Sequence, residues 1–139
     1  MSVTRYKRGA SVTLSKNFSS SEFDCHCKKC NETLIDSRLV EKLEKLRSEL
    51  RCPIKITSGY RCPGRQELLR TMGFETSEHK SSHEMGMAAD VYVQGVSGVE
   101  LSSAAEKAGF PSIGKSLTWI HVDIRGLDDG KQRRWDYKK

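Results

Sequence analysis

The sequence has no long apolar run: nothing in its 139 residues approaches the roughly 18 consecutive apolar residues of a membrane-spanning helix. The N-terminal stretch MSVTRYKRGASVTLSKNF starts basic but lacks the apolar core and cleavage site of a signal peptide. Internal repeats and low-complexity segments are lacking as well. We therefore expect one compact domain over residues 1–139, made in a cytoplasm and large enough for a hydrophobic core of its own.

Acidic residues are outnumbered, with 18 Asp and Glu against 24 Lys and Arg, for a formal net charge of +6. Such a charge attracts nucleic acid or another polyanion, for example a cell-wall polymer. The acidic residues are mixed among the basic ones, however, and only KQRRWDYKK, residues 131–139, is a concentrated basic run. We interpret this run as a solvated basic tail. We expect a monomer with neither nucleic acid nor a membrane as its partner.

The chain lacks an even number of cysteines. It has five: Cys25, Cys27, Cys30, Cys52 and Cys62. An odd count without a secretion signal argues against a disulfide framework. The cluster CHCKKC raises the hypothesis of a structural zinc site, with His26 as a further candidate ligand. A second cysteine knuckle is missing, so Cys52 or Cys62 would have to complete the site. Buried or free thiols are the alternative.

Apolar periodicity predicts an α+β fold with a small antiparallel sheet. The clearest helix covers residues 36–50, where apolar residues recur on one face and Asp36 or Ser37 can cap the first turn. A second clear helix over 97–108 starts with the capping box of Ser97 and Glu100. A shorter helix is predicted over 64–73, and strands over 53–58, 87–95 and 117–126. The first 15 residues look loosely held.

The stretch SSHEMGMAAD places a histidine, His83, seven residues before an aspartate, Asp90. On a helix these residues would lie about two turns, roughly 10 Å, apart, which is too far for one metal ion. The chain must double back if both bind the same ion, and Gly86 supplies the backbone freedom for that turn. His121, on the strand predicted over 117–126, is the third candidate ligand. The alternative is that the two histidines are unrelated.

SSHEMGMAAD resembles the pattern S-x-H-x-x-G-x-A-x-D of the zinc D-alanyl-D-alanine carboxypeptidases and related peptidoglycan peptidases. ITSGYRCP resembles the arginine-bearing turn of that family, and WIHVDIRG resembles the H-V-D-x-R-G strand of one of its branches. The resemblance runs from about Leu14 to Trp135, and the lead-in segment is similar to that of bacterial and phage members. Three motifs in the same order make this resemblance specific.

The resemblance implies the fold of these peptidases and of the hedgehog signalling domain, a small antiparallel sheet flanked by helices. It also implies one zinc ion held by His83, Asp90 and His121. Arg61 matches the arginine beside the site, where its guanidinium can bind a substrate carboxylate through two hydrogen bonds. The alternative for Arg61 is a structural salt bridge. Ser81 matches a supporting hydrogen-bonding residue that contributes to substrate binding.

One position departs from the family pattern. Several branches carry a catalytic carboxylate three residues before the last histidine, where this chain has Thr118. Asp123 is the nearest substitute, on the same face of the strand as His121, and we predict it as the catalytic residue that relays the proton. Orienting a metal ligand is the other role open to it. Glu84 and Glu78 are further candidates for the proton acceptor.

The predicted function is zinc-dependent hydrolysis of an amide bond in the stem peptide or cross-bridge of peptidoglycan, as a carboxypeptidase or an endopeptidase of endolysin type. Zinc would lower the pKa of water to about 7 and polarise the scissile carbonyl. Short length and no recognisable signal peptide suit a phage or prophage enzyme that reaches the cell wall with other help. The alternative is a catalytically silent zinc module of the same fold, which Thr118 favours.

Overall fold

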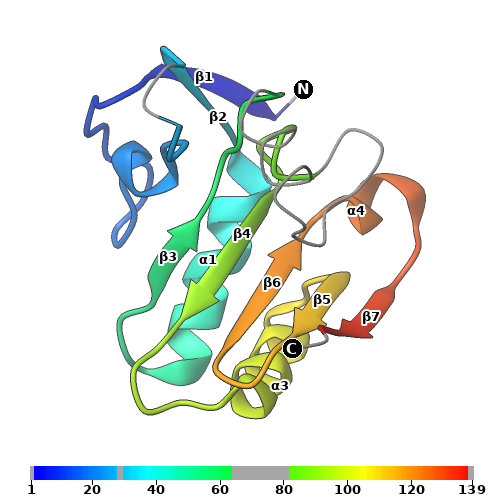
Figure 1. The fold of residues 1–139 in the computed structure, drawn as a ribbon. Coiled ribbons are helices and arrows are strands. Elements are labelled where there is room, and N and C mark those ends of the chain that lie inside the picture. Colours follow the sequence, from blue (N-terminus) through cyan, green and yellow to red (C-terminus); the bar gives the residue numbers. More distant parts are fainter. Residues whose placement is uncertain (1, 28–29, 64–81, 138–139) are drawn as a thin grey trace.

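The computed structural model describes residues 2–27, 30–63 and 82–137. Its main feature is a five-stranded sheet in the order β3-β4-β6-β5-β7 (Figure 1). These strands are β3 (Lys55–Ser58), β4 (Ala88–Tyr92), β5 (Ser112–Lys115), β6 (Trp119–Asp123) and β7 (Arg133–Asp136). Neighbouring strands are antiparallel except for the parallel pair of β5 and β7. The α+β class and the small, largely antiparallel sheet are confirmed.

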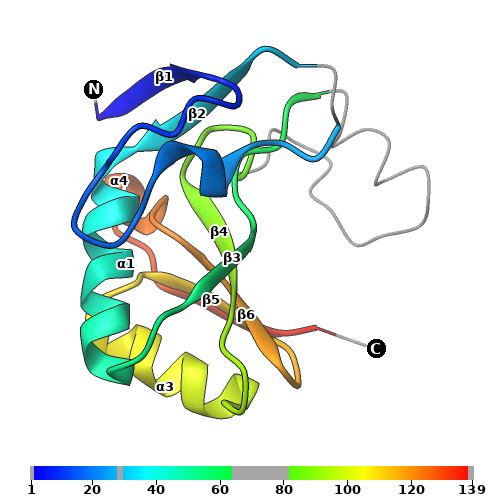
Figure 2. The ribbon, with the colours of Figure 1, turned by 90° about the vertical axis from the view of Figure 1, so that its left-hand side faces the viewer.

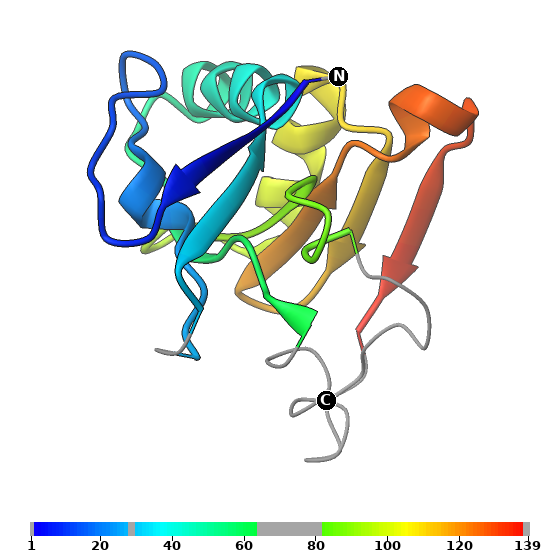
Figure 3. The same cartoon turned by 90° about the horizontal axis from the view of Figure 1, so that it is seen from above.

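Two helices, α1 (Ser37–Leu50) and α3 (Gly98–Ala108), cover one face of this sheet (Figures 2 and 3). The Asp36 carboxylate caps α1 by accepting a hydrogen bond from the backbone of Arg38, and the predicted capping box starts α3. Apolar residues spaced three and four apart turn one face of each helix toward the sheet. The resulting core includes Leu43, Leu46, Leu101, Ala105, Val91, Ile113, Ile120 and Val122. The other face of the sheet is therefore available for polar side chains.

The N-terminal segment is ordered, contrary to the prediction that the first 15 residues are loosely held. β1 (Val3–Lys7) pairs antiparallel with β2 (Glu32–Asp36) in a separate two-stranded sheet. The 3-10 helix η1 (Ser20–Phe23) lies between them in sequence. Backbone pairing with a segment some 30 residues further along fixes this part of the chain, and no local sequence pattern predicts such pairing.

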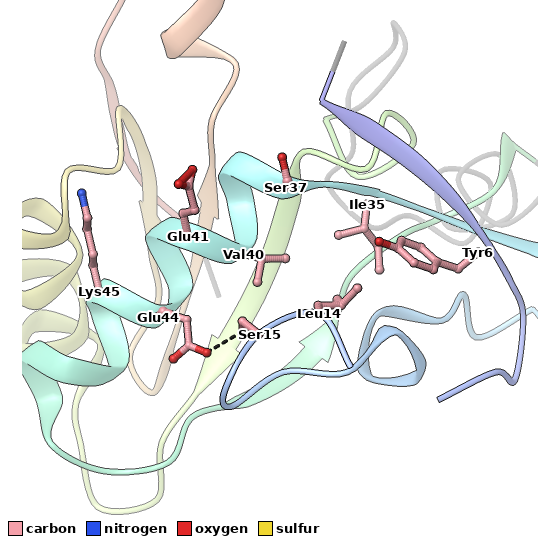
Figure 4. Close-up of a pocket in the computed structure, with 9 residues that line it drawn as sticks. All are labelled: Tyr6, Leu14, Ser15, Ile35, Ser37, Val40, Glu41, Glu44 and Lys45. Atoms are coloured by element: carbon pink, nitrogen blue, oxygen red, sulfur yellow. Dashed lines mark hydrogen bonds between the residues drawn. The ribbon is translucent and has the colours of Figure 1, made fainter. Parts of the chain in front are cut away.

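A hollow of about 550 Å³ lies between the N-terminal segment and α1 (Figure 4). Ser15 and Asn17 both donate hydrogen bonds to the Glu44 carboxylate on α1 at one side of it. Tyr6, Leu14, Ile35 and Val40 give the hollow an apolar wall. These contacts fasten the N-terminal segment to α1, and none of the lining residues is a predicted site residue.

The C-terminal run differs from a solvated tail. After the short helix α4 (Gly126–Asp129), residues Arg133–Asp136 form β7 and extend the sheet beside β5. Alternation along this strand leaves Arg134 and Asp136 exposed and turns Arg133 and Trp135 partly inward. The charge of this run predicted a tail, whereas pairing with β5 decides its conformation.

No helix in the described part of the chain is long and apolar enough to cross a membrane.

Candidate functional site

Two neighbouring strands bring Asp90 and His121 together. β4 and β6 pair antiparallel with Asp90 directly opposite His121. Successive side chains of a strand point to opposite faces, so the buried Ile120 and Val122 face the helices while His121 faces away from them. Asp90 points to the same face as His121, because directly opposed residues share a face of the sheet. The alternation predicted for residues 117–124 thus positions the imidazole.

A tight turn returns His83 to this pair. Gly86 has φ +76° and closes the turn with a hydrogen bond from its N–H to the His83 carbonyl at 3.2 Å. A Cβ at Gly86 would lie 2.6 Å from the Leu34 carbonyl oxygen, so a side chain has no room there. The chain doubles back as predicted, and Ala88 and Ala89 are buried at the start of β4.

Three ligand atoms form a nearly equilateral triangle. The Nε2 atom of His83 lies 3.2 Å from Nδ1 of His121 and 3.4 Å from Oδ1 of Asp90. Nδ1 of His121 lies 3.2 Å from the same oxygen. Zinc holds nitrogen and oxygen ligands at about 2.0–2.2 Å with tetrahedral angles, which puts them roughly 3.3–3.6 Å apart. Two imidazoles and one carboxylate in this triangle therefore fit a zinc ion with one position left over.

Hydrogen bonds set the tautomer of each imidazole. Nδ1 of His83 donates to the carbonyl oxygen of Gly59 at 2.7 Å, which leaves Nε2 with its lone pair toward the triangle. Nε2 of His121 donates to the Asp123 carboxylate at 2.7 Å, which leaves Nδ1 toward the triangle. Metal-binding histidines typically have their second nitrogen held in this way.

Asp123 is fully buried, and several donors surround its carboxylate. Besides His121, Oδ2 accepts from the Ser82 hydroxyl at 3.3 Å. Oδ1 accepts from the backbone N–H of Arg125 at 3.2 Å and faces the Arg125 guanidinium. Burial raises the pKa of Asp123, but the hydrogen bond from His121 and the charges of His121 and Arg125 together outweigh it and lower the pKa overall. The carboxylate contacts Nε2 of His121, not the nitrogen that faces the triangle.

The electrostatics of the site favour an ionised Asp90, a positive charge on His121 and a neutral His83. Burial lowers the pKa of His83, which keeps its imidazole neutral. Burial raises the pKa of Asp90, but the two histidines outweigh it and hold that pKa well below its usual range. Burial also lowers the pKa of His121, whereas hydrogen bonds to Asp123 and Asp90 raise it to about 9. Carboxylates thus lie on both sides of the His121 ring.

Arg61 lies beside the triangle and holds the second oxygen of Asp90. Its Nη2 donates to Oδ2 of Asp90 at 3.1 Å, and its Nε donates to the Ser58 hydroxyl at 3.1 Å. Its side chain is only 18% exposed. This ion pair turns Oδ1 of Asp90 toward the histidines. A guanidinium has five N–H donors, so these two contacts do not exhaust it.

An aromatic wall on one side of the triangle was not predicted from the sequence. The ring centroid of Trp135 lies 5.3 Å from that of His121, and Tyr137 lies 6.0 Å from Trp135. Gly114 stands between His121 and Trp135 in the sheet, and a Cβ there would lie 2.4 Å from the indole. Burial raises the pKa of Tyr137 to about 12, so its phenol stays protonated. Trp135 and Tyr137 are two residues apart, which places both on one face of an extended segment. This spacing is the sequence feature from which the wall could have been predicted.

The other predicted site residues lie as follows. Ser81 and Glu78 lie outside the described residues. Glu84 is half-buried on the turn next to His83, and Thr118 is exposed just before β6. Ser82 was not predicted as a site residue, yet its hydroxyl donates a hydrogen bond to the Asp123 carboxylate.

A family model described as Peptidase M15 matches residues 16–123. The matched segment contains all three corners of the triangle, together with Arg61 and Asp123. No curated protein matches the chain.

Proposed function

Because the match covers well over half of its length, the chain belongs to the peptidase M15 family, and from this premise we propose that it is a zinc-dependent peptidoglycan peptidase. The family supports a zinc metallopeptidase that acts on a peptide-like substrate. We propose an amide bond in the stem peptide or cross-bridge as the bond that is cut. The triangle of His83, Asp90 and His121, whose edges suit a tetrahedral zinc ion, is the observation that carries the proposal.

In this proposal each residue near the triangle has a distinct task. His83, Asp90 and His121 hold one zinc ion, which supplies the Lewis acidity that activates water and polarises the scissile carbonyl. Asp123 holds the His121 ring in the tautomer that binds metal. Arg61 orients Asp90 and binds a carboxylate of the substrate with its other N–H groups.

The contacts of Asp123 support the orienting role over the catalytic one. Proton transfer by Asp123 would require its carboxylate to leave His121, Ser82 and Arg125. Glu84, which adjoins His83 on the turn, is the carboxylate we propose as proton acceptor in its place. The protonated phenol of Tyr137, in the aromatic wall, can donate a hydrogen bond to substrate.

We propose that the enzyme acts on the bacterial cell wall and is delivered there by a phage-type route. The runner-up is a catalytically silent zinc module of the same fold. The observation in its favour is Thr118, exposed at the position where family branches carry a carboxylate.

Digestion of purified peptidoglycan tests the proposal. We expect new muropeptides whose masses and new termini identify the cut amide bond. Prolonged chelation should abolish their release and added zinc should restore it, because the activated water depends on the ion. Chelator saturated beforehand with zinc is the matched control. A wall left intact by zinc-loaded protein would favour the silent module.

Substituting Arg61 tests how the substrate is bound. For Arg61→Ala we expect kcat/KM to fall roughly 10- to 100-fold, since a hydrogen bond to a charged group contributes about 1.5–3 kcal/mol. The fall should be larger for a peptide with a free carboxylate than for its carboxamide, because only the former is an anion, whereas the lost contact with Asp90 affects both. Kinetics on the matched pair of peptides measures the difference. Equal losses on both peptides would mean that Arg61 acts only through Asp90.

A further inference from the structure

Four cysteines from two distant segments meet at a second place in the molecule. Cys25, Cys27 and Cys30 lie between η1 and β2, whereas Cys62 follows β3. Their sulfur atoms all lie within 4.8 Å of one another. The sequence left Cys52 and Cys62 as the two candidates to complete the CHCKKC cluster. Cys62 completes it, and Cys52 belongs to no such group among the described residues.

The sulfur–sulfur distances suit a shared metal ion. The Sγ atom of Cys62 lies 3.7 Å from that of Cys25 and 3.5 Å from that of Cys27. A tetrahedral zinc ion with Zn–S bonds of about 2.3 Å puts its sulfurs roughly 3.8 Å apart. A disulfide needs a separation of about 2.05 Å, and pairing two sulfurs would not explain why four converge.

Two of the sulfurs accept hydrogen bonds from backbone N–H groups. The backbone N–H of Cys30 donates to Sγ of Cys27 at 3.4 Å, and that of Cys62 donates to Sγ of Cys25 at 3.4 Å. Such donors orient thiolate ligands and spread their charge. The Arg8 guanidinium lies close by, with a hydrogen bond of 3.0 Å to the Cys25 carbonyl. Its positive charge offsets part of the excess negative charge that four thiolates around one zinc ion carry.

We propose that Cys25, Cys27, Cys30 and Cys62 bind a second zinc ion with a structural role. Four protein ligands fill a tetrahedral zinc, so this ion has no position for water and does no chemistry on the substrate. Binding removes one proton from each of the four thiols, and the protons pass to solvent. No electron is transferred and no oxidant is required.

The second ion would brace the segment that leads into the first site. Arg61 lies immediately before Cys62. Gly59, whose carbonyl sets the His83 tautomer, lies three residues before it. The Arg61 N–H donates to the His83 carbonyl at 3.2 Å, and the Tyr60 N–H donates to the Phe23 carbonyl at 2.8 Å. A Cβ at Gly59 would lie 2.7 Å from Cα of Phe23, so the two segments touch at the backbone. This bracing role rests on the proposed function, whereas the cysteine site itself does not.

Metal analysis of protein purified under reducing conditions tests the proposal. We expect about two zinc ions per chain, falling to about one in Cys27→Ser and about one in His83→Ala. Cys52→Ser is the matched control and should keep both ions. If Cys27→Ser loses one ion while the unmutated, zinc-loaded protein does not cleave peptidoglycan, the cysteine site is supported and the proposed function is removed. Full zinc content in Cys27→Ser would overturn the site.

Replacing zinc by cobalt tests the same site in the unmutated protein, so the result does not depend on whether a cysteine variant folds. Cobalt bound to thiolates has an intense sulfur-to-metal charge-transfer absorption in the near ultraviolet, and cobalt bound only to nitrogen and oxygen has none. We expect this band in the unmutated protein and, at equal strength, in His83→Ala. Its absence from the cobalt-loaded unmutated protein would overturn the proposal, as would a disulfide among the four cysteines found by mass spectrometry after purification under reducing conditions.

Discussion

We expect His83→Ala to abolish zinc binding at the triangle and to lower kcat/KM by about 10³-fold or more, because zinc lowers the pKa of water from about 15.7 to about 7 and the variant would lose that nucleophile. The imidazole is buried and supplies one of three ligand atoms spaced 3.2–3.4 Å apart. Alanine offers no ligand atom, and two remaining ligands bind zinc too weakly to hold it during purification. Zinc content and the rate of muropeptide release measure the two effects.

His26→Ala is the matched control, because it also removes one imidazole, from an exposed position outside the triangle. It should keep full activity. Circular dichroism and thermal unfolding of both variants separate loss of the metal from loss of the fold. Unchanged cleavage by a folded His83→Ala variant would remove zinc at the triangle from the mechanism. A zinc ion that remains bound to His83→Ala is the one that we assign to the cysteine cluster.

We expect Asp123→Asn to weaken zinc binding at the triangle about 10- to 100-fold, the usual cost of losing the carboxylate that holds a metal-binding histidine. Asparagine keeps the size of the side chain but lacks the negative charge that holds Nε2–H of His121 at 2.7 Å. It also leaves the Arg125 guanidinium without its partner at 3.3 Å. Zinc affinity, measured by competition with a chromogenic chelator, reports the effect directly.

Asp128→Asn is the control for the charge change, because Asp128 is exposed and pairs with Arg38 on α1. Its zinc affinity should match that of the unmutated protein. Activity of Asp123→Asn at saturating zinc then separates the two roles considered for this residue. If zinc affinity stays the same while kcat falls, Asp123 transfers the proton and does not orient His121. If affinity falls and saturating zinc restores most of kcat, the orienting role stands.

Local regularity explains which elements could be predicted. The helix α1 and the capped helix α3 follow from apolar spacing and from Asp36, Ser97 and Glu100, all of which act within a few residues. The alternation around His121 predicts β6 and the face on which the imidazole lies. Gly86 predicts the turn, since a positive φ there strongly favours glycine.

Long-range pairing explains what could not be predicted. β7 exists because Arg133–Asp136 pairs with Ser112–Lys115, and nothing within a basic run reveals that partner. The N-terminal segment is ordered for the same reason, through β2. Charge thus indicated a tail, while the hydrogen-bonding groups of an open sheet edge decided otherwise.

For the site, the amino-acid sequence was enough to name His83, Asp90 and His121 as candidate ligands and to identify the family, because ligand chemistry and motif order are written residue by residue. Which nitrogen of each ring faces the triangle, which cysteine completes the cluster and where the Asp123 carboxylate lies all needed the folded chain. Those properties depend on distances between groups up to about 40 positions apart, and only the packing of the whole domain sets such distances.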